Sequence, residues 1–469
     1  MSVGTGTSTP RWVSRLVILW GVQLVDVLVV TSVIPAIPAM LAATGAPRGA
    51  ATLLSASAAM AFAGLLLLSA RLGDRFGHRR ILVAGLVVFG LAAVTGGTAH
   101  SVGQLVVARI GQGVAAALCV PAAMWALLRL SPEPGRRRTA LAGWSAAGAA
   151  AGVLGYVVGG GLTELLGWSW VFWINVPITG LLIAGVVLLV PADTADDGVR
   201  LDVWGAVLLT TSVMALVGAA AVLQDGAAGW GVAGLLAGAV LGVLFAVQQG
   251  RAAEPLVARS SRRDPHLRAG VGASFVNTAT TSGIAIVVVL ILQDDLGLSP
   301  AVAAVVMMPF SVAVVIGSLA SRLPALATGS VRPTVLGLLA ISAGGLILAI
   351  RHDQVAAIVT AIAVAGVGLG LASVGATSLG TTKVESGRST AGRGGRSGVE
   401  GSGPPGADSA AVGLLNTAAQ LGNALGVAAL LALLALPRGG ASAAFLLAAA
   451  AGLGTALAVR RSSARFATH

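Results

Sequence analysis

Two charged residues stand inside long apolar stretches, where a charge is costly. Asp26 lies within Leu24–Val30, and Arg109 lies within Ala108–Gly113. A charge at the centre of a membrane span costs about 2.5–3.5 kcal/mol on insertion scales, so each such residue is a functional candidate. Burial favours the protonated form of a carboxylate, and a nearby cation favours the ionised form. We therefore predict that Asp26 binds and releases a proton, with Arg109 or a cationic substrate tipping the balance.

Two alternatives for these residues stay open at this point. Asp26 and Arg109 could form a static pair that only holds two helices together. Arg109 could instead orient main-chain groups and Gln112, which lies one helical turn further along. All three interpretations need the same residue types at the same positions.

A short basic stretch, residues 69–80, separates the second and third apolar segments. It holds four arginines, one aspartate and two glycines. A charge cluster between two membrane-length segments predicts that two helices turn back at a membrane face and that the turn is a working part. Membrane topology alone explains the arginines, but it does not explain Asp74 between two glycines. The residues of interest in this turn are Arg71, Gly73, Asp74, Arg75, Gly77 and Arg79.

The fifth apolar segment is unusually rich in small residues. Glycine at four-residue spacing lets helix backbones approach closely, and close packing alone would explain most of these glycines. Clustered glycine also lets a helix bend during a conformational change. The candidate motif in this segment consists of Gly152, Gly155, Tyr156, Gly159 and Gly160.

Aromatic residues are scarce in the chain, so those within apolar segments are candidates for a cavity that takes a flat apolar or cationic ligand. Asn416, Gln420 and Asn423 form a polar stripe on one helix face, for which hydrogen bonding between helices is the alternative interpretation. The predicted cavity residues are Trp20, Gln112, Trp125, Trp144, Phe275, Asn416 and Gln420.

Several function classes are excluded by what the sequence lacks. It has no Ser-His-Asp arrangement, no paired acids, no metal-ligand spacing and no phosphate-binding Walker loop, and its one cysteine rules out an internal disulfide. We expect no enzyme activity, no cofactor and no metal site. Transport driven by an ion gradient remains.

The elements that position these residues are predicted to be membrane-spanning helices. The 469 residues are 56% hydrophobic and 10% charged, with a mean hydropathy of +0.92, whereas soluble domains carry about 25% charged residues. The apolar runs are continuous, which favours helices over a barrel. Fourteen segments are expected, at roughly 16–40, 50–70, 80–98, 102–128, 139–163, 171–190, 204–224, 230–248, 268–292, 301–321, 333–350, 355–380, 408–436 and 441–459.

Basic residues fix the expected orientation. With the gaps between segments numbered alternately, 25 of the 29 lysines and arginines fall on one side, three on the other, and Arg109 within a segment. This bias places both termini in the cytoplasm. It also explains the net charge of +12 as topology, so no nucleic-acid partner is expected.

The segments divide as six, two and six, as in a duplicated transporter core with two additional central helices. We expect a six-helix bundle over residues 1–190, and an acidic loop, two helices and a basic linker over 191–267. A second six-helix bundle is expected over 268–469, with a flexible, Gly- and Ser-rich cytoplasmic loop at 381–407.

The pattern resembles the major facilitator superfamily, in particular its fourteen-spanner drug–proton antiporter branch. Residues 71–80 (RLGDRFGHRR) are similar to the superfamily's loop 2–3 signature, with Ala70 in place of the first glycine. Residues 109–113 (RIGQG) are similar to the fourth-helix motif, and Asp26 with the following Val-Ile-Pro resembles the first-helix pattern. Residues 167–177 and 414–422 are also branch-like. In the fifth helix Tyr156 stands where the antiporter signature has proline, and Ser169 replaces an arginine.

This resemblance implies alternating access, and it implies that Asp74 and Arg75, supported by Arg79, act as a conformational latch. We expect a monomer in the cytoplasmic (inner) membrane of the cell that exports small amphipathic drugs or natural products in exchange for protons. Its partners are then the substrate, protons and the lipid bilayer. The alternatives are a proton-coupled uptake permease, which Tyr156 keeps open, and a membrane receptor without transport activity.

Overall fold

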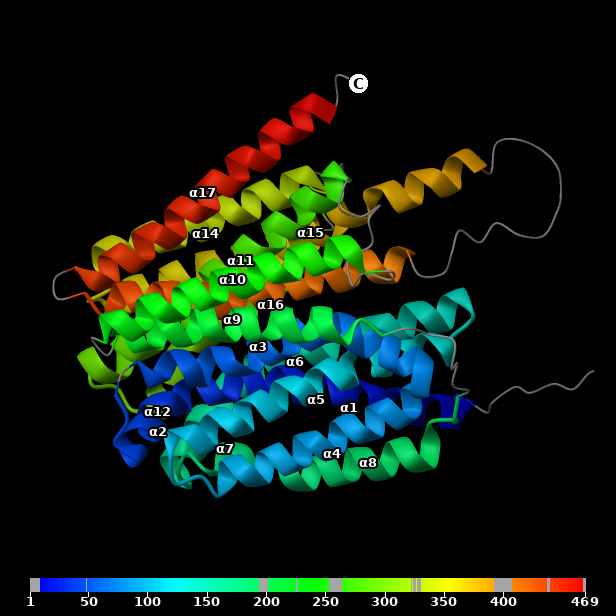
Figure 1. The fold of residues 1–469 in the computed structure, drawn as a ribbon, viewed down its shortest axis with the longest axis horizontal. Coiled ribbons are helices and arrows are strands. Elements are labelled where there is room, and N and C mark those ends of the chain that lie inside the picture. Colours follow the sequence, from blue (N-terminus) through cyan, green and yellow to red (C-terminus); the bar gives the residue numbers. More distant parts are fainter. Residues whose placement is uncertain are drawn as a thin grey trace, which may run out of the picture. The chain divides into compact units, whose positions relative to one another are not determined.

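The computed structural model describes residues 9–47, 49–193, 201–224, 227–252, 264–321, 323, 326, 330–391, 407–436 and 439–466. The regular elements in these ranges are helices (Figure 1). In chain order they are α1 (Thr9–Val33), η1 (Ile34–Ala36), α2 (Ile37–Thr44), α3 (Ala50–Phe76), α4 (His78–Gly97), α5 (Val102–Arg129), α6 (Pro134–Leu165), α7 (Trp170–Trp173), α8 (Asn175–Leu189), α9 (Val203–Gln224), α10 (Ala228–Arg251), α11 (Pro265–Leu290), η3 (Ile291–Asp295), α12 (Pro300–Ala320), α14 (Val331–Arg351), α15 (Val355–Ala391), α16 (Ala407–Leu434) and α17 (Gly440–Phe466).

Most of these helices are long and apolar enough to cross a membrane. Thirteen stretches in the described part of the chain meet this condition. Helix α3 contributes a shorter apolar stretch, Ala50–Leu66, within a helix of 27 residues. Each of the fourteen segments expected from the sequence coincides with one of these stretches, so the prediction of an all-helical, multi-pass membrane fold is confirmed. The count of fourteen depends on α3, whose last turns carry the charged stretch.

The chain divides into two compact units. The first comprises residues 1–46, 68–201 and 299–304, and the second comprises residues 47–67, 202–298 and 305–469. The division therefore passes through α3, and it separates the first turn of α12 from the rest of that helix.

The core of the first unit is built from α1, α4, α5, α6 and α8. Fully buried apolar side chains such as Leu19, Leu82 and Val186 meet there, together with small residues such as Ala123 and Ala140. Lipid is as apolar as these side chains, so helix association in a membrane depends on close packing rather than on removal from water. Small residues at the contacts permit that packing.

In the second unit, α9 and α10 lie side by side as a helical hairpin (Figure 1). Glycines on α10 face α9, and a Cβ on Gly234 would lie 2.8 Å from that of Ala219. Asp202 ties the hairpin's ends together. Its carboxylate accepts from the main-chain N–H of Gly205 at 2.9 Å, and from the side chains of Gln248 and Gln249 at 2.7 and 2.6 Å.

The loop expected at residues 381–407 begins later than the sequence suggested. Helix α15 continues to Ala391, and α16 begins at Ala407. The stretch after residue 380 contains no proline before Pro404 and several helix-compatible residues, so nothing local ends the helix at its membrane-length limit. Residues 392–406, which hold the rest of the expected loop, lie outside the described part of the chain.

Candidate functional site

The charged turn between α3 and α4 is made by one residue, Gly77. Its φ of +91° is a conformation that side-chain-bearing residues rarely adopt. The N–H of Gly77 donates to the carbonyl of Gly73 at 2.9 Å, which completes the last turn of α3. Arg71 lies half-buried on the preceding turn. The predicted tight turn is therefore a single-residue corner between two long helices.

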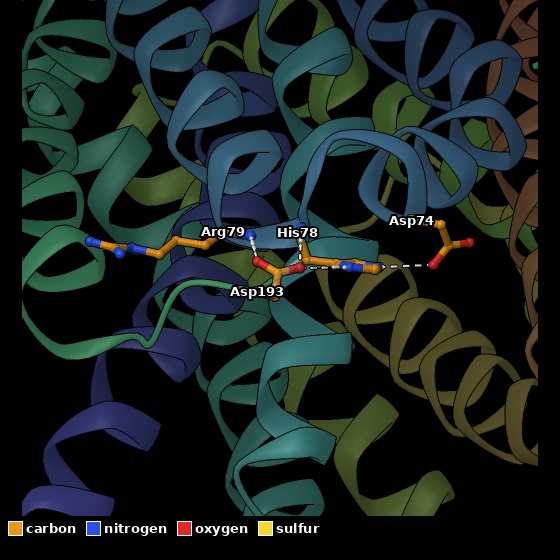
Figure 2. A network of polar contacts seen from close by, with 4 residues as sticks. All are labelled: Asp74, His78, Arg79 and Asp193. Atoms are coloured by element: carbon orange, nitrogen blue, oxygen red, sulfur yellow. Dashed lines mark hydrogen bonds and ion pairs between the residues drawn. The ribbon is translucent and has the colours of Figure 1, made fainter. Parts of the chain in front are cut away.

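Asp193, which follows α8, closes the start of α4. Its carboxylate accepts from the main-chain N–H of His78 at 2.6 Å and of Arg79 at 3.0 Å (Figure 2). The first N–H groups of a helix have no partner within the helix, so an acid at this place satisfies them and complements the helix dipole. Burial raises the pKa of Asp193, but its hydrogen bonds from Arg79 and His78 outweigh burial, so that the pKa is lowered overall.

His78 connects this cap to the latch aspartate. Its imidazole Nδ1 lies 3.2 Å from Asp193, and its Nε2 lies 3.5 Å from Asp74, so that the ring stands between two carboxylates (Figure 2). The ring also stacks on Trp125 of α5, with centroids 4.0 Å apart. A Cβ on Gly73 would lie 2.6 Å from the imidazole. Gly73 is therefore needed to make room for His78.

The other latch residues lie around this network. The side chain of Asp74 is 54% exposed. The guanidinium of Arg75 lies 5.5 Å from the ring of its neighbour Phe76. Arg79 donates through Nη2 to the carbonyl of Val187 in α8, and Figure 2 shows its side chain pointing away from the two carboxylates.

Trp125 extends the network to the end of α5. The guanidinium of Arg129 lies 5.1 Å from the Trp125 ring, on which His78 also stacks. The structure therefore places Trp125, a predicted cavity residue, in contact with the charged turn.

Arg109 is almost completely buried on α5, at 2% exposure. Its Nη1 donates to Gln112 Oε1 at 2.8 Å and to the carbonyl of Val29 at 3.4 Å. Val29 lies one helical turn after Asp26 on α1. These two contacts are the ones that the interpretation in which Arg109 orients a main-chain group and Gln112 predicts, and the role itself stays a prediction. The Nε2 of Gln112 is buried without a partner in the described part of the chain.

The glycines of the fifth apolar segment line contacts of α6. A Cβ on Gly155 would overlap the side chain of Thr31, and one on Gly159 would overlap the carbonyl of Ser32, so both glycines pack closely on α1. Gly160, the next residue, faces Pro300 instead, at 2.6 Å from its carbonyl.

Two members of the same motif behave differently. A Cβ on Gly152 would have no neighbouring atom within 4 Å, so space does not require glycine there. Tyr156, which stands in place of the antiporter proline, is buried at 2% exposure.

The two remaining predicted aromatic residues of the first unit also pack against helices. Trp20 donates through Nε1 to the carbonyl of Ala140 at 3.0 Å and lies against Gly143 of α6. Trp144 is 8% exposed within the core of the unit. Both side chains help to join α1 and α6.

The second unit contains an open apolar groove of about 510 Å³. Phe275 of α11 lines it, together with Leu421 of α16 and Thr455 of α17. Asn416 and Gln420 are half-buried on α16 and are not among the lining residues. The structure thus brings only Phe275 of the predicted cavity set to this groove.

Polar contacts between helices are frequent near the groove. Ser274 donates to the carbonyl of Leu415 at 3.0 Å, and Thr278 donates to that of Ala419 at 2.6 Å. These bonds join α11 to α16 through residues outside the predicted polar stripe.

Sequence reasoning missed His78 and Asp193 as site residues. His78 lies in the charged stretch at residues 69–80, and Asp193 lies in the acidic loop after the sixth segment. The available signal was position, since Asp193 is the first acid after that segment and His78 is the first residue after Gly77.

Charged side chains within membrane-length helices are rare and mark substrate or ion pathways, as in membrane transporters. The family model described as Major Facilitator Superfamily matches residues 19–395. The chain belongs to the major facilitator superfamily.

Similar proteins include named resistance and export proteins. The puromycin resistance protein pur8 of Streptomyces alboniger is 32% identical over 443 residues, covering 91% of this chain and 82% of that protein. The cephamycin export protein CmcT of Amycolatopsis lactamdurans is 35% identical over 412 residues, covering 86% and 81%.

Solved structures agree on the fold. A POT family transporter in complex with a thioalcohol-conjugated peptide superposes with a TM-score of 0.69 at 13% identity, covering 96% of both chains. The human organic anion transporter MFSD10 gives a TM-score of 0.61 at 14% identity, covering 96% of this chain and 99% of that one.

Proposed function

We propose that this protein exports small amphipathic drugs or natural products across the cytoplasmic membrane in exchange for protons, by alternating access. The similarity to proteins named for antibiotic resistance and export supports the direction of transport. Membership of a transporter superfamily and the lack of a catalytic motif in the sequence favour a transporter over an enzyme. The chain acts as a monomer and needs no cofactor.

The observation that carries proton coupling is the contact of Arg109 with α1. Its guanidinium donates to the Val29 carbonyl, one turn from Asp26. A carboxyl on the same helix therefore has a buried cation near by. Asp26 exchanges a proton in this role, and movement of α1 against α5 changes the influence of Arg109 on it.

The positive-inside bias of the sequence supports a cytoplasmic position for both termini and for the Gly77 corner. Asp74 and Arg75, supported by Arg79, act there as a latch between conformations. The cap that Asp193 makes on α4 keeps the corner rigid, so that the exposed Asp74 is presented in one position.

Substrate selection uses apolar and aromatic surface. The groove lined by Phe275 is a candidate contact for an amphipathic compound, because its known lining is almost entirely apolar. Gln112, with a buried amide nitrogen lacking a partner in the described part of the chain, is a candidate hydrogen-bond donor in the first unit.

Everted membrane vesicles from a pump-deficient host test the direction of transport. With a proton gradient acid inside, an exporter accumulates a fluorescent drug in the vesicles, and a protonophore abolishes the accumulation. Drug accumulation in intact cells instead of vesicles would establish the uptake permease. Absence of substrate-dependent flux over a panel of antibiotics and dyes would establish the receptor without transport activity.

A further inference from the structure

The end of α6 is fastened to the start of α12 by Glu164. Its Oε2 accepts from the hydroxyl of Ser299 at 2.6 Å and from the main-chain N–H of Ala301 at 3.0 Å. Ser299 also accepts from the N–H of Val302 at 3.4 Å, so the carboxylate and the serine together satisfy the first free N–H groups of α12. The charge of Glu164 is favourable at this positive end of the helix.

A second contact lies one turn earlier on α6. A Cβ on Gly160 would lie 2.6 Å from the carbonyl of Pro300 and 2.5 Å from the Cβ of Ala304. The two helices therefore meet at backbone distance, and glycine at position 160 is what permits it. Glu164 lies one helical turn after Gly160, next to the last residue of α6.

The contact is confined to one turn of α12. Residues 299–304 belong to the first unit, whereas α12 from Val305 onward belongs to the second. Glu164 is exposed, and its bonds are reached by solvent. A contact of this kind is specific in geometry yet weak enough to break and reform.

The contact is far from the charged corner within the first unit. Helix α6 has 32 residues, and at ~1.5 Å per residue its two ends are roughly 48 Å apart. Its first turn follows α5, whose last turn contacts the corner through Trp125. Glu164 therefore lies at the opposite end of the unit from Asp74.

We propose that Glu164 is an outer latch: it holds the first turn of α12 against α6 while the transporter is closed to the outside, and this contact breaks when it opens outward. The inference rests on the proposed function for the existence of an outward-open state. It assigns Glu164 a positioning role, with Ser299 as its partner.

Thiol labelling tests the latch without any substrate. Cys119 is buried, and a Cys119→Ala parent carrying Ala304→Cys has one reporter beneath Gly160. A membrane-impermeant maleimide is added to intact cells. Glu164→Ala should raise the labelling rate about two- to tenfold, the factor expected for losing one net hydrogen bond, and Glu164→Gln should give a smaller rise. Should Ala304→Cys fail to fold, Ala301→Cys, half-buried on the same turn, replaces it as reporter.

Two comparisons make the test specific. Glu133→Gln, at the opposite end of α6 beside Arg136, should leave the rate unchanged. Ser299→Ala should raise it, and the double variant with Glu164→Ala should rise no further than the larger single change, because both remove one contact. Equal rates in Glu164→Ala and its parent, additive effects in the double variant, or labelling only in everted vesicles would overturn the latch. Loss of efflux in the parent would overturn the proposed function instead.

Discussion

The carboxylate of Asp193 holds His78 by two of its nitrogens, at 2.6 Å from the main-chain nitrogen and 3.2 Å from Nδ1. The two residues are 115 positions apart in the chain. A residue beyond the last helix of the first six-helix set thus fixes both the start of α4 and the ring that faces Asp74. This relationship ties the geometry of the predicted latch to the end of α8.

Removing that cap should destabilise the first unit. We expect Asp193→Ala to lower the free energy of unfolding by about 1 kcal/mol, within the range of roughly 0.5–2 kcal/mol measured for helix caps. Chemical unfolding in detergent measures the change. Asp74→Ala removes an exposed carboxylate from the same network and should have a smaller effect. An equal loss of unfolding free energy in both variants would mean that capping of α4 by Asp193 contributes no particular stability.

The contribution of Asp193 should depend on pH. Because its folded-state pKa is lowered, its stabilisation is fully present above the unfolded pKa of about 3.9 and is lost as the pH falls through the folded value. The difference in stability between the parent and Asp193→Asn should therefore be constant near neutral pH and shrink in acid. Thermal unfolding midpoints of both proteins across the acidic range give this difference. A gap that widened in acid would contradict the sign of the shift.

The corner between α3 and α4 should not tolerate a side chain. At Gly77 the φ of +91° is strained for any other residue, and we expect Gly77→Ala to cost about 1–3 kcal/mol of unfolding free energy. Gly135→Ala is the matched control, because a Cβ there meets nothing within 4 Å. Comparison of the two unfolding curves tests the expectation, and equal curves would show that the corner relaxes freely.

Gly159 and Gly152 should respond differently to the same substitution. Gly159→Ala forces the backbones of α6 and α1 apart at the Ser32 carbonyl, and overpacking of this kind costs about 1–3 kcal/mol. Gly152→Ala meets open space and should be neutral or slightly stabilising. Unfolding and efflux rates are measured for both variants. A stable, active Gly159→Ala protein would show that this close approach is not required.

The sequence was sufficient to predict the helical membrane fold, because apolar runs of membrane length need no partner to be recognised. A tight turn within residues 69–80 was also predictable, since the gap between two long apolar segments is short, but its position at Gly77 was not, because α3 continues to Phe76 and α4 begins at His78. The sequence singled out Arg109 because a charge in an apolar run is energetically costly. Its hydrogen bond to Gln112 was predictable from the spacing of the two residues on one helix.

The partners across the fold were not predictable. No local pattern links Asp193 to His78 or Glu164 to Ser299, which is 135 positions away. The sequence predicts that the tryptophans line a cavity, because aromatic rings suit ligands. In the structure, Trp20 donates a hydrogen bond to the carbonyl of Ala140, and the ring of Trp125 stacks on His78. Such choices between packing and binding are decided by tertiary contacts.

The central claim is that Asp26 carries the exchanged proton. The purified protein is reconstituted into proteoliposomes loaded with a pH-sensitive dye. Addition of a transported drug should cause release of protons. The Asp26→Asn variant should still fold and bind the drug, but it should not release protons. Asp295→Asn, an exposed acid outside the membrane centre, should behave as the parent does. Drug-dependent proton release of normal size in Asp26→Asn would contradict the account.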